Sequence, residues 1–490
     1  MSPGNNEPLY LCLDQGGHAS RALVFDARGR QRCHARQPLV AEQSASGHIE
    51  YPADALLDSL RACIDDILQQ LGTQGQQLTA AALATQRSNI VCWDHDSGAA
   101  LSPIISWQDR RNADWLQQFE PQAGRIHTLT GLPLSPHYGA SKLRWCLDNL
   151  SAVQQAQREG RLRLGPMAAW LAGRLTREGE ARADPVNASR TQLWSLQEHD
   201  WHPELLELFG IPRQLLPPCV PNLGHYGQLL AGELELPLAL VNGDQSAALY
   251  AYGPLREDTA YLNLGTGAFV SRPVGQRPLF DDRLLSSVVL QGTRQSSYVL
   301  EGTVNGAGAA LDWLARQHGL DELAPAQLNQ WLKDEYDAVP LFLNGVAGLA
   351  APYWRPDFES RFIGADELPH QAVAVLESIV FLLQSNLQHM ARHRPTPSRL
   401  QITGGLSHLD EVCQRLADLT GRPVHRPADC EATARGSAFL VAGQPDHWPE
   451  PGPGHEFSPT HNSPLQERYR SWRDAMNKAL DRGQGLEPRT

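Results

Sequence analysis

Short apolar runs alternate along the chain with longer segments of helical periodicity. The first run, Leu9–Leu13, is followed by a glycine turn at Gln15–His18 and a second run, Arg21–Asp26. Two short runs joined by a polar, glycine-bearing turn predict a β-hairpin. In Ala55–Leu71 apolar residues recur every three or four positions, which predicts an amphipathic helix with Asp54 as its N-cap.

A second strand–turn–strand unit lies about 250 residues further on, where Ala260–Leu264 and Ala268–Arg272 flank Gly265-Thr266-Gly267. The repeat suggests two related domains that face one another. Further strands are predicted at Ala81–Thr85, Ile90–Trp93, Leu236–Val241 and Arg399–Thr403, and helices at Gln245–Tyr252, Gly306–Gln317, His370–Arg392, Leu409–Thr420 and about Leu465–Leu480. Strands that alternate with helices indicate an α/β class.

The chain has 490 residues, more than the ~250–300 at which a single hydrophobic core stops growing, so two domains are expected. The predicted boundaries give a first domain at residues 1–252 and a second at 253–443. A loop rich in Pro, Gly and His follows, with a C-terminal helix, over residues 444–490.

Composition narrows the function classes. Acidic residues number 54 against 42 basic ones, for a net charge of -12, which argues against binding a nucleic-acid backbone. The eight cysteines form no CxxC pair and are typical of buried thiols in a reducing, cytoplasmic compartment. The N-terminus lacks the features of a secretion signal, and no run of about 18 apolar residues predicts a membrane span.

Phosphate binding would depend on glycine turns, because the chain has no Gly-Lys dipeptide and so no Walker A loop. Successive backbone amides in a tight turn can form an anion-binding nest. Three turns qualify: Gln15–Ser20, Gly265–Gly267 and Gly404-Gly405. Each alone is more often an ordinary turn, but the matching strands around two of them favour phosphate binding.

Two carboxylates stand at predicted strand ends. Asp14 lies beside the first glycine turn, where it could hold Mg²⁺ through water or simply form an Asx-turn. Asp244 lies between a strand and a helix, where it could cap the helix. It could equally act as a general base that takes the proton from an attacking hydroxyl at a domain cleft.

A series of motifs, in this order and spacing, resembles the FGGY carbohydrate kinases from about residue 9 to residue 443. The motifs are Asp14–Arg21, Trp107–Arg111, Asn187–Thr191, Gly243–Ala248, Gly265–Gly267, Ala351–Trp354 and Gly404–Ser407 with Gln414 and Ala417-Asp418. Within that family the chain is most similar to glycerol kinases, especially in Trp107–Arg111, Ala140–Trp145 and Asn187–Thr191.

The resemblance implies two actin-like ATPase (ribonuclease H-like) domains flanking a catalytic cleft, with Asp244 as base and Asp14 organising Mg²⁺. It implies contacts to the polyol or sugar from Arg87, Ser88, Trp107, His137, Tyr138, Gln245 and Phe269. It implies contacts to ATP from Gly16, Gly17, His18, Ser20, Arg21, Gly265, Thr266, Gly267, Gly308, Gly404 and Gly405. The reaction would be in-line phosphoryl transfer in a closed cleft. A homodimer is an assembly that the resemblance allows.

The first phosphate loop departs from the family, which usually reads Asp-Gln-Gly-Thr-Thr-Ser-Ser-Arg. Gly17, His18 and Ala19 replace three hydroxyl residues here. Each hydrogen bond lost is worth roughly 0.5–1.5 kcal/mol, and more to a charged acceptor. One hypothesis is that protonated His18 binds the phosphates instead, because histidine titrates near neutrality. An activity profile that is flat from about pH 6 to 8 and unaltered by His18→Thr would reject it.

The substrate side departs as well. Ser88 stands where glycerol kinases carry a Glu, His137 where they carry a Tyr, and Leu409 where the adenosine loop has an Asn. Because a site that pairs a substrate hydroxyl discriminates strongly, losing the Glu acceptor should change the substrate. The shorter Ser88 leaves room for a longer polyol or a ketose, so glycerol is not expected to be the best substrate.

A second function class stays open, in which the chain is a degenerate kinase that binds nucleotide or polyol as a sensor. The altered first loop motivates it. The retained Asp14, Arg21, Arg87 and Asp244 argue for an enzyme, since a drifting pseudo-enzyme has no chemical reason to keep them.

Overall fold

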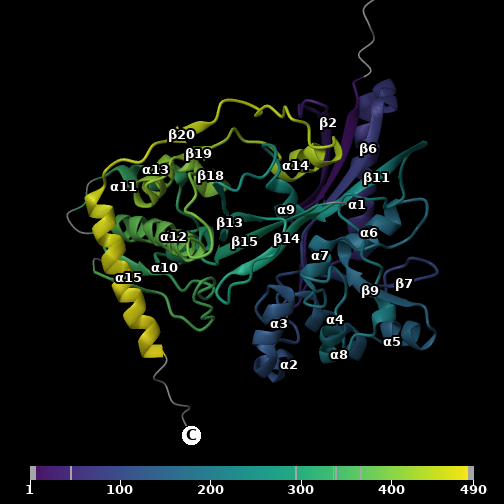
Figure 1. The fold of residues 1–490 in the computed structure, drawn as a ribbon, viewed down its shortest axis with the longest axis horizontal. Helices are drawn as coiled ribbons and strands as arrows, with labels where there is room; N and C mark the ends of the chain where they lie inside the picture. The colour runs from purple at the N-terminus through teal and green to yellow at the C-terminus, as the bar shows by residue number, and fades with distance from the viewer. Residues whose placement is uncertain are drawn as a thin grey trace, which may run out of the picture.

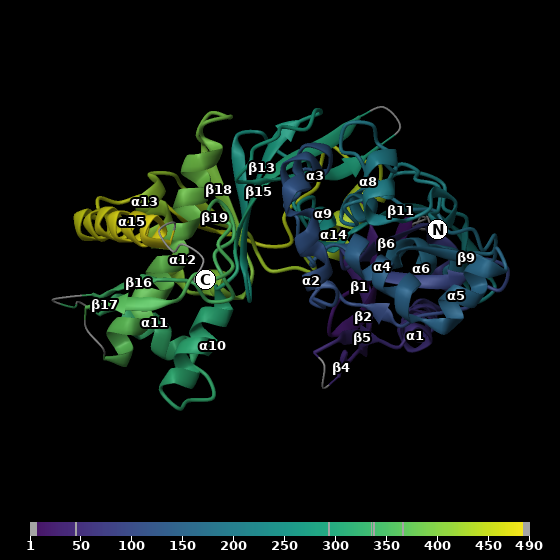
Figure 2. The same cartoon turned by 90° about the horizontal axis from the view of Figure 1, so that it is seen from below.

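The computed structural model describes residues 7–44, 47–292, 295–334, 336, 339–364 and 367–483. The chain folds into two lobes, each built on a mixed β-sheet with helices packed against it (Figure 1). Figure 2 shows β13 and β15 of the second lobe along the boundary with the first. The outermost residues of the predicted domains, 1–6 and 484–490, lie outside the described residues.

The first sheet has the strand order β10-β11-β6-β1-β2-β3. Its strands are β1 (Leu9–Gln15), β2 (Ala19–Asp26), β3 (Gln31–Pro38), β6 (Leu78–Thr85), β10 (Gln228–Ala231) and β11 (Leu234–Gly243). β1 and β2 form the predicted antiparallel hairpin, and β1, β6 and β11 run parallel. The carboxyl ends of β1, β6 and β11 therefore meet at one edge of the sheet.

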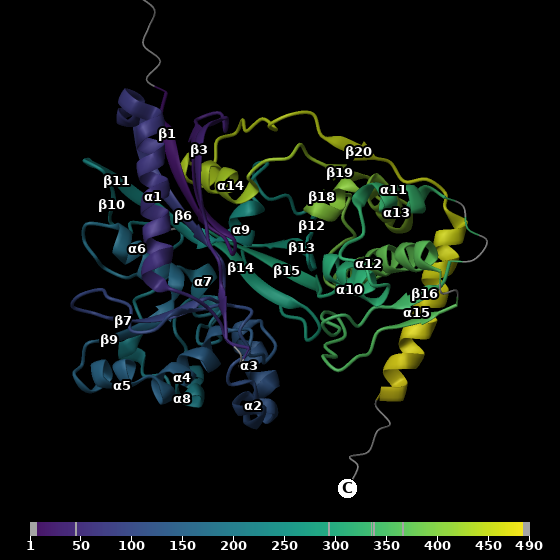
Figure 3. The same ribbon diagram turned by 180° about the vertical axis from the view of Figure 1, so that it is seen from behind.

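Helix α1 (Ala53–Leu71) covers this sheet by packing on β2 and β3 (Figure 3). Its apolar stripe, which includes Leu60, Ile64 and Ile67, is buried as its periodicity predicts. The predicted N-cap is wrong, because the helix begins two residues earlier, at Ala53. Pro52 occupies the cap position and Asp54 lies in the first turn, where its charge favours the helix dipole.

The second sheet repeats the first. Its order is β14-β15-β13-β12-β18-β19-β20, with β12 (Thr259–Leu264), β13 (Ala268–Gly275), β14 (Leu285–Gln291), β15 (Ser296–Val304), β18 (Arg399–Thr403), β19 (Val424–Arg426) and β20 (His455–Phe457). β12 is antiparallel to β13 and parallel to β18, as β1 is to β2 and β6. The predicted repeat is confirmed. The predicted loop at 444–465 is wrong in one part, because β20 pairs with β19.

The remaining elements surround these sheets. The first lobe adds a sheet of β4 (Glu42–Gln43), β5 (Ile49–Tyr51), β7 (Ile90–Asp94), β8 (Ile104–Ile105) and β9 (Leu162–Pro166), with α2 (Ala113–Leu116), α3 (Ala123–Thr130), α4 (Gly139–Asn149), α5 (Ser151–Arg158), α6 (Met167–Leu175), α7 (Pro185–Ser189), α8 (Pro203–Phe209) and α9 (Asp244–Ala248). The second lobe adds α10 (Gly308–Gln317), α11 (Pro325–Lys333), β16 (Leu341–Leu343), β17 (Arg361–Ile363), α12 (Leu368–Met390), α13 (Asp410–Thr420) and α15 (Ser463–Gly483). α9 ends four residues before the predicted Tyr252, in a run of turns.

Helix α12 is long and apolar enough to span a membrane by length and composition alone. It is mostly buried inside the second lobe, where it packs on α10, α11, α13 and β15. α15 is joined to α12 by an ion pair between Arg468 Nη2 and Glu377 Oε1 at 2.6 Å. Trp472 of α15 is fully buried and donates to the Phe342 carbonyl at 2.9 Å. The apolar surface of α12 is thus accounted for by the core.

Helix α14 (Ala432–Val441) comes late in the chain but packs on β1, β6 and α9 of the first lobe (Figure 1). Gly436 makes this approach feasible, since a Cβ added there would lie 1.9 Å from the Ala247 carbonyl oxygen. Arg435 beside it is buried and donates to the Gly29 carbonyl at 3.2 Å. α14 therefore supports α9, the short helix that begins at Asp244.

We predict that Gly436→Ala destabilises the protein by about 1–3 kcal/mol, because the added methyl group overpacks the α14–α9 contact. Gly124→Ala is the matched control. Gly124 also lies in a helix, α3, with open space around its Cβ position, so alanine there should be neutral or stabilising by up to about 1 kcal/mol. Thermal unfolding midpoints measure both. An equal effect of the two variants would contradict the close approach at Gly436.

Candidate active site

Three neighbouring strand ends bring the polar candidates together. Asp14 of β1 pairs in register with Ala84 of β6, and Gly243 of β11 pairs with Thr85. Asp244 follows β11 directly and Arg87 follows β6 by two residues. Parallel strands place their carboxyl ends at the same edge, which is the usual position of a ligand site in an open α/β sheet.

Asp14 is buried, with 4% of its surface exposed, and accepts a hydrogen bond from Arg21 Nη1 at 3.1 Å. Burial and the nearby Asp244 carboxylate raise the pKa of Asp14 to about 7, although Arg21 acts in the opposite direction. Arg21 also approaches Glu431 Oε2 at 3.9 Å, at the entrance to α14. The carboxylates of Asp14, Asp244 and Glu431 thus lie near one another, and a bound cation would reduce their repulsion.

Asp244 opens α9 and is half-buried, with its Oδ1 accepting from the Gln245 amide at 2.7 Å. Burial raises its pKa above the ordinary value, and Arg87 and Arg190 partly offset that rise. A carboxylate with a raised pKa is a better proton acceptor near neutral pH.

Glu301 of β15 crosses from the second lobe to two arginines of the first. Its carboxylate accepts from Arg190 Nη2 at 2.9 and 3.0 Å and from Arg87 Nη1 at 3.4 Å. All three side chains are at most 11% exposed. Burial alone would raise the pKa of Glu301, but Arg190 and Arg87 lower it to about 2. Glu301 therefore stays ionised and ties the two lobes together near Asp244.

Arg87 links Glu301 to the segment that carries Asp244. Its Nη2 donates to Gln245 Oε1, the residue that follows Asp244. Glu301 and Asp244 thus both act on one guanidinium. Arg87 and Gln245 are among the residues predicted for the site, whereas Glu301 is not. A signal was available, because Glu301 is the only charged residue in the otherwise apolar and small run of β15.

Three aromatic side chains, those of Trp107, His137 and Tyr138, pack together and form one wall of the candidate site. The His137 ring lies edge-on to Trp107, with centroids 5.1 Å apart, and to Tyr138 at 5.2 Å. Tyr138 is buried and contacts Arg190. Burial and the nearby Lys142 lower the pKa of His137, so its imidazole is neutral and can both donate to and accept from a hydroxyl.

Lys142 of α4 lies beneath this wall and is fully buried. Its ammonium donates to the His137 carbonyl at 2.8 Å and to the Ser88 carbonyl at 3.5 Å, so it joins two predicted substrate segments. Ser88 adopts a left-handed φ of 64°. Its buried Oγ has no hydrogen-bond partner within the described part of the chain, which leaves it available to a ligand.

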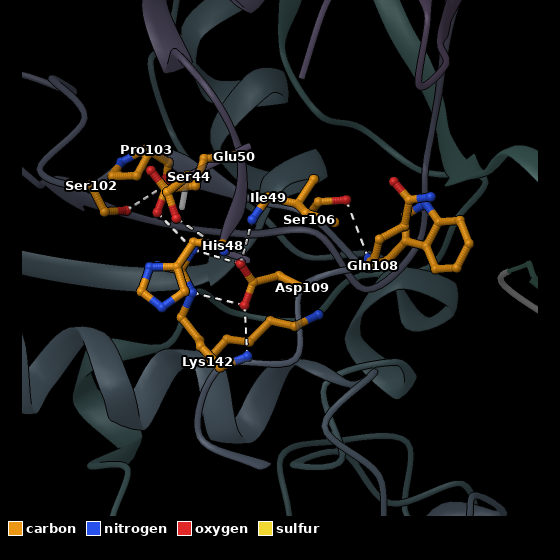
Figure 4. Close-up of polar contacts among 12 residues, drawn as sticks. Ser44, His48, Ile49, Glu50, Ser102, Pro103, Ser106, Gln108, Asp109 and Lys142 are labelled. Carbon is orange, nitrogen blue, oxygen red and sulfur yellow. Dashed lines mark hydrogen bonds and ion pairs between the residues drawn. The ribbon is translucent and has the colours of Figure 1, made fainter. Parts of the chain in front are cut away.

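Trp107 is positioned by the segment that follows it. The Asp109 carboxylate accepts from the Ile49 amide at 2.7 Å, and the Gln108 amide donates to Ser106 Oγ at 3.2 Å (Figure 4). Arg111 donates to Asp109 as well, at 2.6 Å from Nη2 to Oδ2. Asp109 and Arg111 therefore anchor the loop of the Trp107–Arg111 motif, and its tryptophan lies against His137.

The first glycine turn is packed against this wall. Tyr51 donates to the Gly17 carbonyl at 3.0 Å. The Gln86 amide oxygen can accept from both the Gly17 amide, at 3.3 Å, and Trp107 Nε1, at 3.2 Å. A Cβ at Gly17 would lie 2.7 Å from the end of the Gln86 side chain, which would have to move aside. Gly17 thus packs against Gln86, while His18 beside it is exposed.

The second glycine turn, Gly265–Gly267, lies against the start of α10. The Gly308 amide donates to the Gly265 carbonyl at 2.9 Å, and a Cβ at Gly308 would lie 3.0 Å from that oxygen. Thr266 is exposed at the tip, and Phe269 of β13 is half-buried next to the turn. The positive end of the α10 dipole adds to this surface, which suits an anion.

The third turn also requires glycine. Gly404 has φ 92°, and a Cβ there would lie 2.6 Å from the Leu264 carbonyl oxygen. Gly405 is exposed with open space around it. Leu409 is buried at the cap of α13, so its side chain faces the core.

Gly16 and Ser20 of the first loop, both predicted to contact ATP, lie in different environments in the structure. Gly16 lies in the turn, its amide bonded to the Ala19 carbonyl at 3.0 Å. Ser20 is fully buried, and its hydroxyl lies 2.8 Å from Ser59 Oγ of α1. Because neighbouring strand residues point to opposite faces, Arg21 faces Asp14 and Ser20 faces the core.

Comparisons with known proteins agree with this architecture. Residues 9–249 match the N-terminal domain of the FGGY family of carbohydrate kinases, and residues 260–443 match its C-terminal domain. A glycerol kinase from Rhodospirillum rubrum is 34% identical over 449 residues, covering 89% of this chain and 90% of its own. One from Alkalilimnicola ehrlichii is 35% identical over 445 residues, covering 88% and 89%.

Solved structures show the same fold. Plasmodium falciparum glycerol kinase with ADP has a TM-score of 0.87 at 21% identity and covers 97% of this chain and 98% of its own. A xylulose kinase from Rhodospirillum rubrum has a TM-score of 0.84 at 20% identity, covering 97% and 99%. The chain belongs to the FGGY family of carbohydrate kinases. It is an enzyme of that class, and the predicted two-domain α/β fold is confirmed.

We predict that Glu301→Gln lowers stability at neutral pH by about 3–5 kcal/mol, because it leaves two buried guanidinium groups without their anion. Since the pKa of Glu301 is lowered to about 2, its contribution is present above the ordinary glutamate range near pH 4.5 and is lost as pH falls toward 2. The difference between the variant and wild type should therefore shrink across that window in thermal unfolding.

The control is Glu204→Gln, which removes an exposed ion pair with Arg125 and should change stability by less than about 1 kcal/mol. A Glu301→Gln effect that is equally small, or that does not change between pH 7 and pH 3, would contradict the role of this carboxylate between the lobes.

Proposed function

We propose that the chain transfers the γ-phosphoryl group of ATP to a hydroxyl of a small polyol or sugar. The observation that carries the proposal is the placement of Asp244. It follows the carboxyl end of β11, at the edge of the sheet where β1 ends with Asp14 close by, and Arg87 and Gln245 lie next to it. ATP would lie against Gly265–Gly267, Gly308 and Gly404-Gly405. Location in the cytoplasm and assembly as a homodimer stay predictions.

In the proposed reaction, Asp244 accepts the proton of the substrate hydroxyl as that oxygen attacks the γ-phosphorus. The new O–P bond forms in line with the bond to ADP, which breaks and leaves its electron pair on ADP. The raised pKa of Asp244 suits a proton acceptor near neutrality. Arg87 and Arg190 are close enough to Asp244 to stabilise its ionised form before the reaction.

The residues present fit a magnesium ion, since the oxygen donors of Asp14 and Asp244 are the hard ligands that Mg²⁺ prefers. Asp14 would hold the ion, with the Arg21 side chain fixing the carboxylate. When bound, Mg²⁺ neutralises phosphate charge. Because the pKa of Asp14 is raised to about 7, cation binding would compete with its protonation, and affinity should fall as pH drops below 7.

Two observations favour a substrate other than glycerol. The buried, unpartnered Oγ of Ser88 is a free donor and acceptor where the family has a longer carboxylate. Its backbone is held by Lys142 together with that of His137, so both departures from the family belong to one wall. A C4 or C5 polyol or a ketose would place an additional hydroxyl within reach of this wall.

Gly17 also bears on the sensor alternative. A side chain at this position would displace the end of Gln86, whose amide bridges the first turn to Trp107. This contact supports an adapted loop in an enzyme over a decayed one. His18 is exposed, and its role toward phosphate stays a prediction.

We predict that ADP release measured over glycerol, C4 and C5 polyols and ketoses gives a kcat/KM at least about 10-fold higher for one of the longer substrates than for glycerol. Asp244→Asn should lower kcat for that substrate by about 100-fold or more while nucleotide binding persists. Asp321→Asn, in an exposed loop of the second lobe, is the control and should match wild type.

A clear preference for glycerol would overturn the substrate assignment alone. Full turnover by Asp244→Asn would overturn the assignment of the base. Nucleotide or polyol binding without turnover of any substrate in the wild-type protein would favour the sensor.

A further inference from the structure

Asp281, His389 and His393 converge at a point in the second lobe that the proposed reaction does not use. His389 Nε2 lies 2.9 and 3.0 Å from the two oxygens of Asp281, and His393 Nε2 lies 2.5 Å from Asp281 Oδ2. One ligand atom from each residue lies within 4.8 Å of the other two. Two imidazole nitrogens therefore face one carboxylate.

The local backbone holds these side chains in place. His389 lies in the last turn of α12, which ends at Met390, and His393 lies in the turn that follows, where its amide donates to the Met390 carbonyl at 3.0 Å. This turn brings both imidazoles to the same carboxylate. Asp281 lies in the loop before β14, where its Oδ1 accepts from the Arg283 amide at 2.8 Å.

The donor set and its surroundings suit a transition-metal ion. Imidazole nitrogen and carboxylate oxygen are ligands for Zn²⁺, whereas Mg²⁺ prefers oxygen alone. Zn–N and Zn–O bonds near 2.0–2.1 Å put tetrahedral ligand atoms about 3.3 Å apart, so a bound ion needs only small side-chain shifts. The side chains of Asp281 and His389 are 6% and 7% exposed, while that of His393 is 30% exposed and leaves a way in from solvent.

The position of the group gives it a structural consequence. The loop that carries Asp281 continues into a contact with the first lobe, where His127 Nε2 lies 3.3 Å from the Leu284 carbonyl oxygen. Two residues later the Ser286 amide donates to the Gly131 carbonyl at 2.9 Å. An ion at Asp281 would join the end of α12 to the loop that meets the first lobe.

We propose that Asp281, His389 and His393 form a binding site for one divalent transition-metal ion, with Zn²⁺ as the preferred occupant and solvent completing the coordination. The site is structural: it fastens the end of α12 to the loop before β14, away from Asp244. It is independent of the proposed kinase reaction.

The test uses the full-length protein, freed of metal with a chelator and dialysed. Titration with Co²⁺ should give visible d–d absorption that saturates at one equivalent and is abolished by Zn²⁺. Calorimetry should give a Kd for Zn²⁺ in the micromolar range or tighter. One equivalent of Zn²⁺ should raise the thermal midpoint by about 2 °C or more, because an ion that binds only the folded state stabilises it.

Two variants and a control assign the ligands. His393→Ala should weaken Zn²⁺ binding at least 10-fold and remove the thermal shift, and its partly exposed position leaves the His389–Asp281 contact in place to support folding. Asp281→Asn should act in the same direction. His318→Ala, an exposed histidine bonded to Gln371, should bind Zn²⁺ like wild type.

Two results would overturn the site. One is a wild-type Kd for Zn²⁺ above about 100 µM. The other is an affinity within twofold of wild type in both His393→Ala and Asp281→Asn, which would place any bound ion elsewhere. Kinase activity enters neither readout, so failure here leaves the proposed reaction untouched.

Discussion

The buried carboxylate of Glu301, held between Arg87 and Arg190, is the interaction on which the geometry of the active site depends. It is the point at which a charged group of the second lobe enters the polar edge of the first. An ion pair removed from water has to be well paired to be tolerated, so the three groups fix their positions mutually. Asp244 interacts electrostatically with the same guanidinium groups. One network therefore influences both the relative position of the lobes and the electrostatics of Asp244, the proposed base.

Around this network the two lobes share the same arrangement of strands. β1, β2 and β6 are related to each other as β12, β13 and β18 are. Each hairpin turn is rich in glycine, and each is packed tightly against a neighbour, Gln86 in the first lobe and the start of α10 in the second. The first copy adds carboxylates at its strand ends, whereas the second adds the positive end of a helix. One copy is thus suited to a cation and a proton acceptor, and the other to phosphate.

Local features of this fold could be predicted from the sequence, and long-range pairs could not. The hairpins, the glycine turns and the strand ends at Asp14 and Asp244 follow from short patterns of apolar, glycine and acidic residues. The orientation of Ser20 was within reach too, because Arg21 and Ser20 must point to opposite faces of β2. The Glu301 network joins residues more than 100 positions apart. β20 has three residues and forms only because β19 offers it an edge.

The aromatic wall of the candidate site also combines features that the sequence predicts with features that only the fold reveals. Ser88 and His137 are visible in the sequence as departures from the family, but the buried Lys142 that holds both backbones is apparent only in the fold. If Glu301 acts through its arginine partners to align the lobes for phosphoryl transfer, the effects of removing Glu301 and Arg190 depend on each other. A double-mutant cycle of Glu301→Gln and Arg190→Gln, read as kcat/KM on the preferred substrate, measures this dependence. We expect a coupling energy above about 1 kcal/mol, whereas effects that add to within about 0.5 kcal/mol would contradict the role of Glu301 between the lobes.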